Sequence, residues 1–187
     1  MTELIQGKSF LLFFRKLADA KSKAADKLKF QTEHAIKTEK ETEATKTKDG
    51  IINSLSDGKN TIDIKSFAYT SDEKTTAIWK ELRRYFKDGD VVEIWQVDLT
   101  SKSSKDQKYE AEYFQGYFTS FEISAPADGQ VELSMTYAIN GNGVEGKDTL
   151  TPEQEQAVSD LLYKYKSMAS GGAETEEVKK KGENFEM

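Results

Sequence analysis

Two alternating stretches joined by a turn constrain the fold of this chain more than any other feature. In the first, "GYFTSFEIS" (116–124), one strand face carries Tyr117, Thr119, Phe121 and Ile123. In the second, "QVELSMTYAI" (130–139), one face carries Val131, Leu133, Met135, Tyr137 and Ile139. The intervening "APADGQ" has a turn composition, with Pro126 and Asp128-Gly129. Because a period of two belongs to half-buried strands, residues 116–140 are predicted to form a long antiparallel hairpin.

Four further stretches predict strands: "SFLLFFRKL", "KLKFQTEH", "TIDIKSFAY" and "VVEIWQVDL". The first is apolar on both faces, as in a central strand covered on both sides. Since the connections resemble hairpins rather than helical crossovers, the predicted fold is mainly β (α+β). It is an antiparallel β-sandwich or small barrel with one packed helix, a long inter-strand arm and a C-terminal helix.

Two segments predict helices. Residues 72–88 follow a capping-box pattern at Thr70 and Glu73 and end before Gly89. Their apolar stripe consists of Ile78, Leu82, Tyr85 and Phe86, while Trp79 is expected to widen the core face or to lie in an interface. The second helix has Thr151 as N-cap, Pro152 at its first position and Gln154 completing the box. Its predicted buried face consists of Val158, Leu161, Leu162, Tyr165 and Met168.

The length of 187 residues predicts one domain, residues 1–170, followed by a flexible charged tail at 171–187. The absence of cysteine excludes disulfides, thiolate zinc sites and a cysteine nucleophile. The net charge of −6 disfavours a nucleic-acid binder with a wide basic face, so the basic-aromatic run "RRYFK" (83–87) is interpreted as a helix end. The longest apolar run, "FLLFF", is too short for a membrane span, and no signal peptide is expected.

The stretch "INGNGVEG" contains Gly141, Gly143 and Gly146 and spells G-x-G-x-x-G. A dinucleotide site needs a helix to begin directly after these glycines, whereas the next helix begins at Pro152. We therefore interpret Gly141 and Gly143 as the end of the hairpin strand, and Gly146 as part of the path toward the helix. No cofactor is predicted.

No catalytic or metal constellation is predicted either. The single histidine, His34, is expected at a strand end without an acid-base partner. The aspartates do not have the spacing of a calcium loop; they are Asp57, Asp63, Asp88, Asp90 and Asp98. Glu110 and Glu112 share one strand face and could act as general acid and base, but a solvated or lumen-facing strand explains them more simply.

Two features suggest self-assembly. Residues 35–60 form a polar stretch rich in Thr, Lys and Glu, longer than connections in compact domains usually are. The hairpin at 116–140 has no edge-protecting residues other than Lys147 beyond its end. An extended arm together with open strand edges favours contacts between copies of the chain.

The same segments, in this order, resemble the major tail proteins, or tail tube proteins, of phages with long non-contractile tails. The resemblance covers most of residues 8–165, and its most specific part is "KYEAEYFQGYFTSFEISAPADGQVELSMTYAINGNG". It implies a structural virion protein, not an enzyme, that forms hexameric rings stacked into the tail tube. The resemblance further implies that the tube is the conduit for DNA ejection and that the DNA passes without specific binding.

The resemblance also implies roles for individual residues and partners. The arm would reach a neighbouring ring through Thr45, Lys46, Thr47, Lys48, Asp49 and Gly50. The lumen-facing candidates are Glu110, Glu112, Glu122 and Glu132. Implied partners are further copies of the chain, the tape measure protein, and the tail terminator and distal tail proteins, with no membrane. Assembly would take place in the bacterial host cytoplasm, and the product would be the virion tail.

An acidic wall suits such a conduit, because duplex DNA carries one negative charge per ~1.7 Å and must not be held. The alternative from another functional class is a β-sandwich binding module for a protein or carbohydrate ligand. That module would need an aromatic platform on a loop, whereas Tyr and Phe in this sequence lie mainly inside predicted strands.

Overall fold

The computed structural model describes residues 4–159. Its strands are β1 (Phe10–Lys16), β2 (Asp26–Lys27), β3 (Gln31–Lys37), β4 (Lys40–Thr47), β5 (Gly50–Asp57), β6 (Thr61–Phe67), β7 (Val92–Asp98), β8 (Tyr109–Ser124), β9 (Glu132–Ile139) and β10 (Val144–Asp148). Its α-helices are α1 (Ile78–Asp88) and α2 (Pro152–Ser159).

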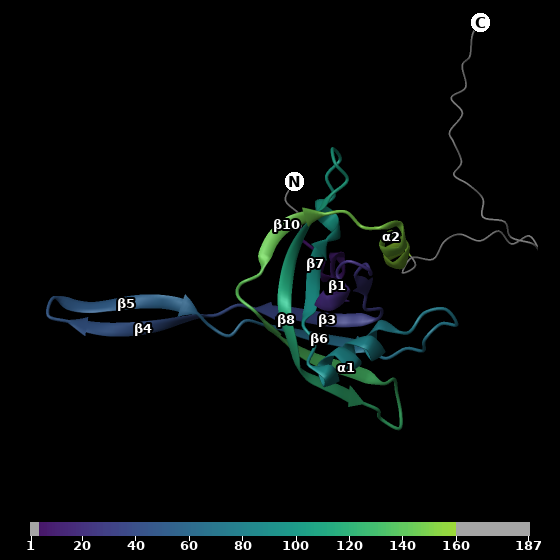
Figure 1. The fold of residues 1–187 in the computed structure, drawn as a ribbon, viewed down its shortest axis with the longest axis horizontal. Helices are drawn as coiled ribbons and strands as arrows, with labels where there is room; N and C mark the ends of the chain where they lie inside the picture. Colours follow the sequence, from purple (N-terminus) through teal and green to yellow (C-terminus); the bar gives the residue numbers. More distant parts are fainter. Residues whose placement is uncertain (1–3, 160–187) are drawn as a thin grey trace, which may run out of the picture.

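Eight of the strands form one antiparallel sheet in the order β2-β1-β7-β8-β9-β6-β3, with β10 pairing the start of β8. The sheet bends over on itself, so that β7 and β8 run across the direction of β3 and β6 (Figure 1). His34 on β3 contacts Gln96 on β7 through their side chains, which places the two layers face to face. The mainly β, antiparallel class predicted from the sequence is confirmed.

The main core lies between these layers. It contains fully buried side chains from both, such as Phe14, Ile64, Ile94 and Tyr137, and α1 packs against it through Ile78, Leu82 and Tyr85. A smaller core on the other face of β1 and β7 is covered by Leu150 and by Val158 of α2. Consequently β1 is buried on both faces, as predicted. In the order of the sheet it is next to the edge, because only the short β2 follows it on that side.

The long hairpin is confirmed, because β8 pairs with β9 from Gly116 to Ser124. The predicted apolar face of β8 is wrong, however. A bulge between Phe118 and Ser120 shifts the register, so Phe118 faces the core together with Phe121 and Ile123. Tyr117, predicted to share the face of Phe121, is instead exposed. The extra residue in one strand reverses the alternation, as a β-bulge does.

The predicted start of the first helix is also wrong. Helix α1 begins at Ile78 without any side-chain cap, and no capping box forms at Thr70 and Glu73. The Ser71 hydroxyl instead accepts a hydrogen bond from the Ala77 amide, which holds residues 71–77 in an irregular connection. The predicted end at Gly89 is confirmed, and Trp79 lies partly buried against the core.

The capping box of α2 is confirmed. The Thr151 amide donates to Gln154 Oε1, and the Gln154 amide donates back to Thr151 Oγ1. Val158 contacts the smaller core as predicted. The remaining predicted buried residues of this helix lie outside the described residues, as does the predicted tail at 171–187.

Two strand predictions need correction. The stretch at 27–34 is interrupted at residues 28–30, where Phe30 adopts a positive φ of 55°, and it therefore forms β2 and part of β3. Strand β10 is absent from the elements predicted from the sequence. Gly146, expected in a connection toward the helix, pairs with Ala111 inside this strand.

Candidate assembly surfaces

The predicted extended arm is a β-hairpin. Strands β4 and β5 pair along their whole length, from Lys40 opposite Asp57 to Thr47 opposite Gly50. They form a separate two-stranded sheet that projects from the body (Figure 1). Every residue of this arm hairpin is exposed. Because an isolated two-stranded hairpin is marginally stable in water, such an element is usually covered by another surface.

The two faces of the arm hairpin differ in character. One face, here called the apolar arm face, carries the apolar residues Ile51, Leu55 and Ala44, with the polar residues Lys40, Thr42, Lys46, Asn53 and Asp57 around them. Ile51 is 65% exposed and Leu55 is 71% exposed. The opposite face carries Glu41, Glu43, Thr45, Ile52 and Ser54. Large apolar side chains that are exposed on one face of a projecting hairpin indicate a contact surface.

The residues predicted to contact a neighbouring ring lie together at the far end of the arm hairpin. They run from Thr45 and Lys46 at the end of β4, through Thr47, Lys48 and Asp49, to Gly50 at the start of β5. Thr47 Oγ1 donates to the Gly50 carbonyl at 2.8 Å and accepts from the Asp49 amide at 3.3 Å. The tip is therefore an ordered turn that presents Lys48 and Asp49 to solvent.

A second surface is the outer face of β3, β6, β9 and the second half of β8, here called the polar sheet face. Cross-strand pairing aligns Ser120, Glu122 and Ser124 with Thr136, Ser134 and Glu132. It continues with Asp63 and Lys65 on β6 and with Glu33 and Lys37 on β3. Thr136 donates to Asp63 at 2.8 Å, and Lys65 contacts Glu33 at 3.3 Å. This face carries small hydroxyl side chains and more acidic than basic residues, so its net charge is weakly negative.

The four candidate glutamates do not share one surface. Glu122 and Glu132 both lie on the polar sheet face. Glu110 and Glu112 lie on the opposite face of β8, because they keep the alternation of Phe114 and precede the bulge. They line a hollow between β7 and β10 with Gln96, Asp98, Glu145 and Lys147. Burial, and then Glu145 directly opposite, raise the pKa of Glu112.

The polar sheet face ends in open strand edges. The pairing of β7 with β8 ends at Val92 opposite Gly116, so residues 117–124 of β8 pair only with β9. At the other side, β3 pairs only with β6 among the described strands. Unpaired backbone groups on such edges can accept a further strand. Four adjacent strands therefore present one buried face, one polar face and two open edges.

Comparison with known proteins identifies the family of this chain. A family model described as phage tail tube protein matches residues 4–145. This chain belongs to that family. The tail tube protein is 26% identical over 169 residues to a putative tail protein of Staphylococcus phage phiMR25, covering 89% of this chain and 84% of the relative. The resemblance inferred from the sequence is thus confirmed.

Solved structures share its fold. The protein of the SPP1 tail tube superposes with a TM-score of 0.69 at 23% identity, over 91% of this chain and 96% of that one. A protein from the tail of a gene transfer agent particle, refined with C6 symmetry, superposes with a TM-score of 0.53 at 16% identity, over 75% of this chain and 98% of that one. The family is described as a tail tube protein, and both neighbours come from phage-like tails.

The other residues considered from the sequence have the following places within residues 4–159. His34 lies inside β3 rather than at a strand end, and its ring nitrogens contact Gln31 and Gln96 at 2.6 and 2.8 Å. Gly141 and Gly143 adopt φ values of 77° and 78° in the turn after β9, as predicted. Within residues 4–159 no cluster of acidic or imidazole side chains could hold a metal ion. Nor is any helix in this range both long and apolar enough to cross a membrane.

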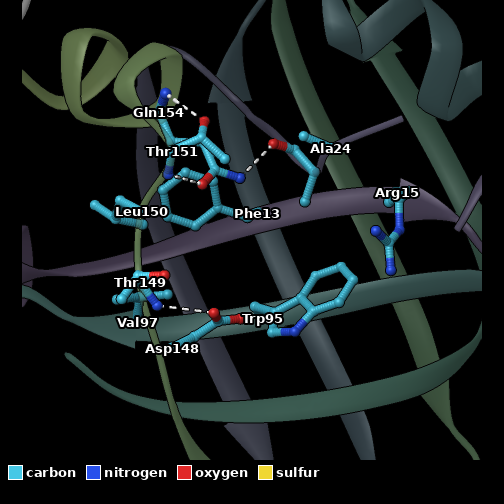
Figure 2. A pocket seen from close by; sticks show the side chains of 11 residues that line it. Phe13, Arg15, Ala24, Trp95, Val97, Asp148, Thr149, Leu150, Thr151 and Gln154 are labelled. Carbon is cyan, nitrogen blue, oxygen red and sulfur yellow. Dashed lines mark hydrogen bonds between the residues drawn. The ribbon is translucent and has the colours of Figure 1, made fainter. Parts of the chain in front are cut away.

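A pocket of about 180 Å³ lies between the smaller core and the start of α2. Phe13, Trp95 and Leu150 form its apolar wall (Figure 2). Gln154 closes one side, where its side chain accepts from the Thr151 amide and donates to the Ala25 carbonyl at 2.8 Å. These bonds attach the start of α2 to the body, so the pocket is explained as the packing junction of that helix.

Proposed function

We propose that this tail tube protein assembles into hexameric rings that stack into a tube, and that the tube is the conduit for DNA ejection. One observation carries this proposal: four adjacent strands combine a buried face, a polar face and two open edges. A sheet segment of this kind can join copies of itself edge to edge. Closing the resulting sheet into a barrel removes every open edge.

In this arrangement the open edge of β8 at residues 117–124 pairs with the open edge of β3 of a neighbouring copy. The buried face of the four strands already packs on the main core. The polar sheet face is then the surface left for the lumen. The sixfold symmetry of the gene transfer agent tail, whose protein has the same fold, supports a hexameric ring.

The charge of the polar sheet face suits the passage of DNA. Its acidic side chains are Glu33, Asp63, Glu122 and Glu132, and its basic ones are Lys37 and Lys65. Cationic side chains would neutralise phosphates and retain the duplex. Among the glutamates suggested by the sequence, we therefore assign Glu122 and Glu132 to the lumen, whereas Glu110 and Glu112 lie on the other face of β8.

The arm hairpin supplies the contact between successive rings. It projects beyond the body, and its apolar arm face is exposed in the single chain. Burying Ile51 and Leu55 against the next ring would contribute roughly 1.5–3 kcal/mol for each side chain. In the virion tail the same tube would enclose a tape measure protein and end at terminator and distal tail proteins, after assembly in the host cytoplasm.

Negative-stain electron microscopy of the concentrated full-length protein tests this proposal. We expect regular tubes for the unmodified chain. The matched variant replaces residues 41–56 by a two-residue Asn-Gly turn, which connects the paired Lys40 and Asp57 directly. It should remain folded and give single rings or short stacks. A protein that stays strictly monomeric at high concentration would contradict the proposal. Long tubes formed by the variant would show that the arm is not needed for ring stacking.

A further inference from the structure

The arm hairpin meets the body at Asn60, a buried polar residue between β5 and β6. Its side chain is only 4% exposed. Its Oδ1 atom accepts a hydrogen bond from the Glu39 amide at 2.9 Å, and Glu39 lies just before β4. Asn60 therefore connects the strand that leaves the arm with the strand that enters it.

The same side chain connects the arm to the glycine-rich turn after β9. Asn60 Nδ2 donates to the Gly141 carbonyl at 2.7 Å and to Asn142 Oδ1 at 2.9 Å. The Asn60 carbonyl in turn accepts from the Ile139 amide at 2.9 Å. Both polar atoms of the Asn60 side chain are therefore hydrogen-bonded: Oδ1 to the segment before β4, and Nδ2 to the turn after β9.

Asn142 completes the connection by contacting the last residue of the arm. Its Nδ2 atom donates to Asp57 Oδ2 at 3.0 Å, while the other oxygen of Asp57 pairs with Lys40 on the opposite strand. The two arm strands also approach closely here, because the Gly58 amide donates to the Glu39 carbonyl at 2.8 Å. Asn60, Asn142 and Asp57 form what we call the root network.

We propose that the root network fixes the direction in which the arm hairpin leaves the body, with Asn60 and Asn142 as positioning residues. The arm has no core of its own, and all of its residues are exposed. Without these bonds only the connections at residues 38–39 and 58–59 would attach it to the body. A hairpin held in one direction loses less conformational freedom when it meets a second copy of the chain.

This inference explains the glycine motif that resembles a nucleotide site. Gly141 and Gly143 adopt left-handed conformations that only glycine occupies without strain, and they place Asn142 between them. That turn directs Asn142 toward Asp57 and the Gly141 carbonyl toward Asn60. The motif therefore positions the groups that hold the base of the arm hairpin. Its contribution to assembly rests on the proposed role of the arm in ring stacking.

The absence of cysteine from the chain permits a direct test. Cysteines introduced by Lys48→Cys at the arm tip and Arg83→Cys on α1 can carry spin labels, since both positions are exposed. Pulsed electron–electron double resonance on the unassembled full-length protein then measures the distribution of distances between the two spin labels. The root network is disrupted by Asn142→Ala or, more completely, by Asn60→Ala. The matched control is Asn140→Ala, because the Asn140 side chain makes no hydrogen bond within residues 4–159.

We expect a narrow distribution for the unmodified chain and the control, and a distribution at least about twofold wider for both root variants. If only a fraction of arms points correctly, the concentration needed for tube formation rises by the inverse of that fraction, so that a fraction of about one tenth gives a rise of about tenfold. Circular dichroism and thermal unfolding identify a variant that fails to fold. Asn142→Ala, which leaves the bond from Asn60 to Glu39 intact, serves if Asn60→Ala fails.

Unchanged widths in the folded root variants would overturn the inference. Wider distributions combined with normal tube formation would leave the root network established and would contradict the contribution of the arm direction to tube formation. The Asn-Gly replacement of residues 41–56 separates the two ideas further, since it removes the arm and keeps Asn60, Asn142 and Asp57.

Discussion

Gly116 on β8 lies directly against the carbonyl oxygen of Ala138 on β9, and a β-carbon at position 116 would come within 1.9 Å of that oxygen. The same β-carbon would lie 3.1 Å from the ring of Tyr137. Tyr137 passes over this point and donates from its hydroxyl to the Val92 carbonyl on β7 at 2.6 Å. The absence of a side chain at Gly116 therefore lets three neighbouring strands come together around a buried tyrosine.

Gly116→Ala is expected to destabilise the protein by about 3 kcal/mol or more, since backbone rather than a flexible side chain must move. Urea unfolding of the unassembled protein measures the change. Gly146→Ala on β10 is the matched control, because its β-carbon would meet nothing within 4 Å, and its stability should be nearly unchanged. Equal stabilities for the two variants would refute this explanation.

The single histidine should make folding sensitive to acid. Burial lowers the pKa of His34 below 6.5, so the folded protein favours the neutral ring between Gln31 and Gln96. As the pH falls below 6.5, the unfolded chain binds a proton that the folded chain resists, and stability decreases. His34→Gln should lose less stability than the unmodified chain between about pH 7.5 and about pH 5.5. The same dependence in both proteins would show that other groups are responsible.

The apolar arm face should be required for tube formation. Replacing Ile51 and Leu55 together by threonine keeps a good strand former and removes apolar surface that is exposed in the single chain. We expect unchanged thermal unfolding of the monomer and a loss of long tubes, measured by sedimentation and electron microscopy. Ile52→Thr, on the opposite arm face, is the control and should still form tubes. Loss of tubes in the control alone would show that the opposite face of the arm hairpin, which carries Ile52, makes the contact.

Reversing the charge on the polar sheet face should make the tube retain duplex DNA. Tubes carrying both Glu122→Lys and Glu132→Lys are expected to co-sediment with short duplex DNA at about 50 mM salt and to release most of it at about 200 mM. Tubes carrying Glu110→Lys and Glu112→Lys, whose charges lie on the other face of β8, should retain much less. Equal retention by both would argue against the assignment of the lumen.

Much of this fold follows from local patterns in the sequence. The alternation in β9 correctly predicts that Leu133, Met135 and Tyr137 are buried. The capping box at Thr151 and Gln154 forms as expected. These features depend on residues near one another in the chain, where side-chain period and backbone hydrogen bonding are linked directly. The family resemblance rests on the order of the same segments.

The wrong predictions concern contacts that no local pattern reveals, and most of these contacts join distant segments. The bulge after Phe118 depends on how β8 pairs with β9, and it separates Glu110 and Glu112 from Glu122. The start of α1 depends on Ser71 holding the Ala77 amide, which a capping pattern at Thr70 does not reveal. β10 is missed because its alternation is weak and its position is set by pairing with β8.

The sequence by itself determined the strand-rich class, the polar composition of the arm and the acidic character of the chain, because periodicity and charge are properties of neighbouring residues. Only the tertiary structure decided which glutamates share a face and how the arm is held. Asn60 and Asn142 are far apart in the chain, and their contact exists only after β6 and β9 pair. The physical reason is that strand pairing and its bulges are non-local, so one inserted residue exchanges the two faces of a strand.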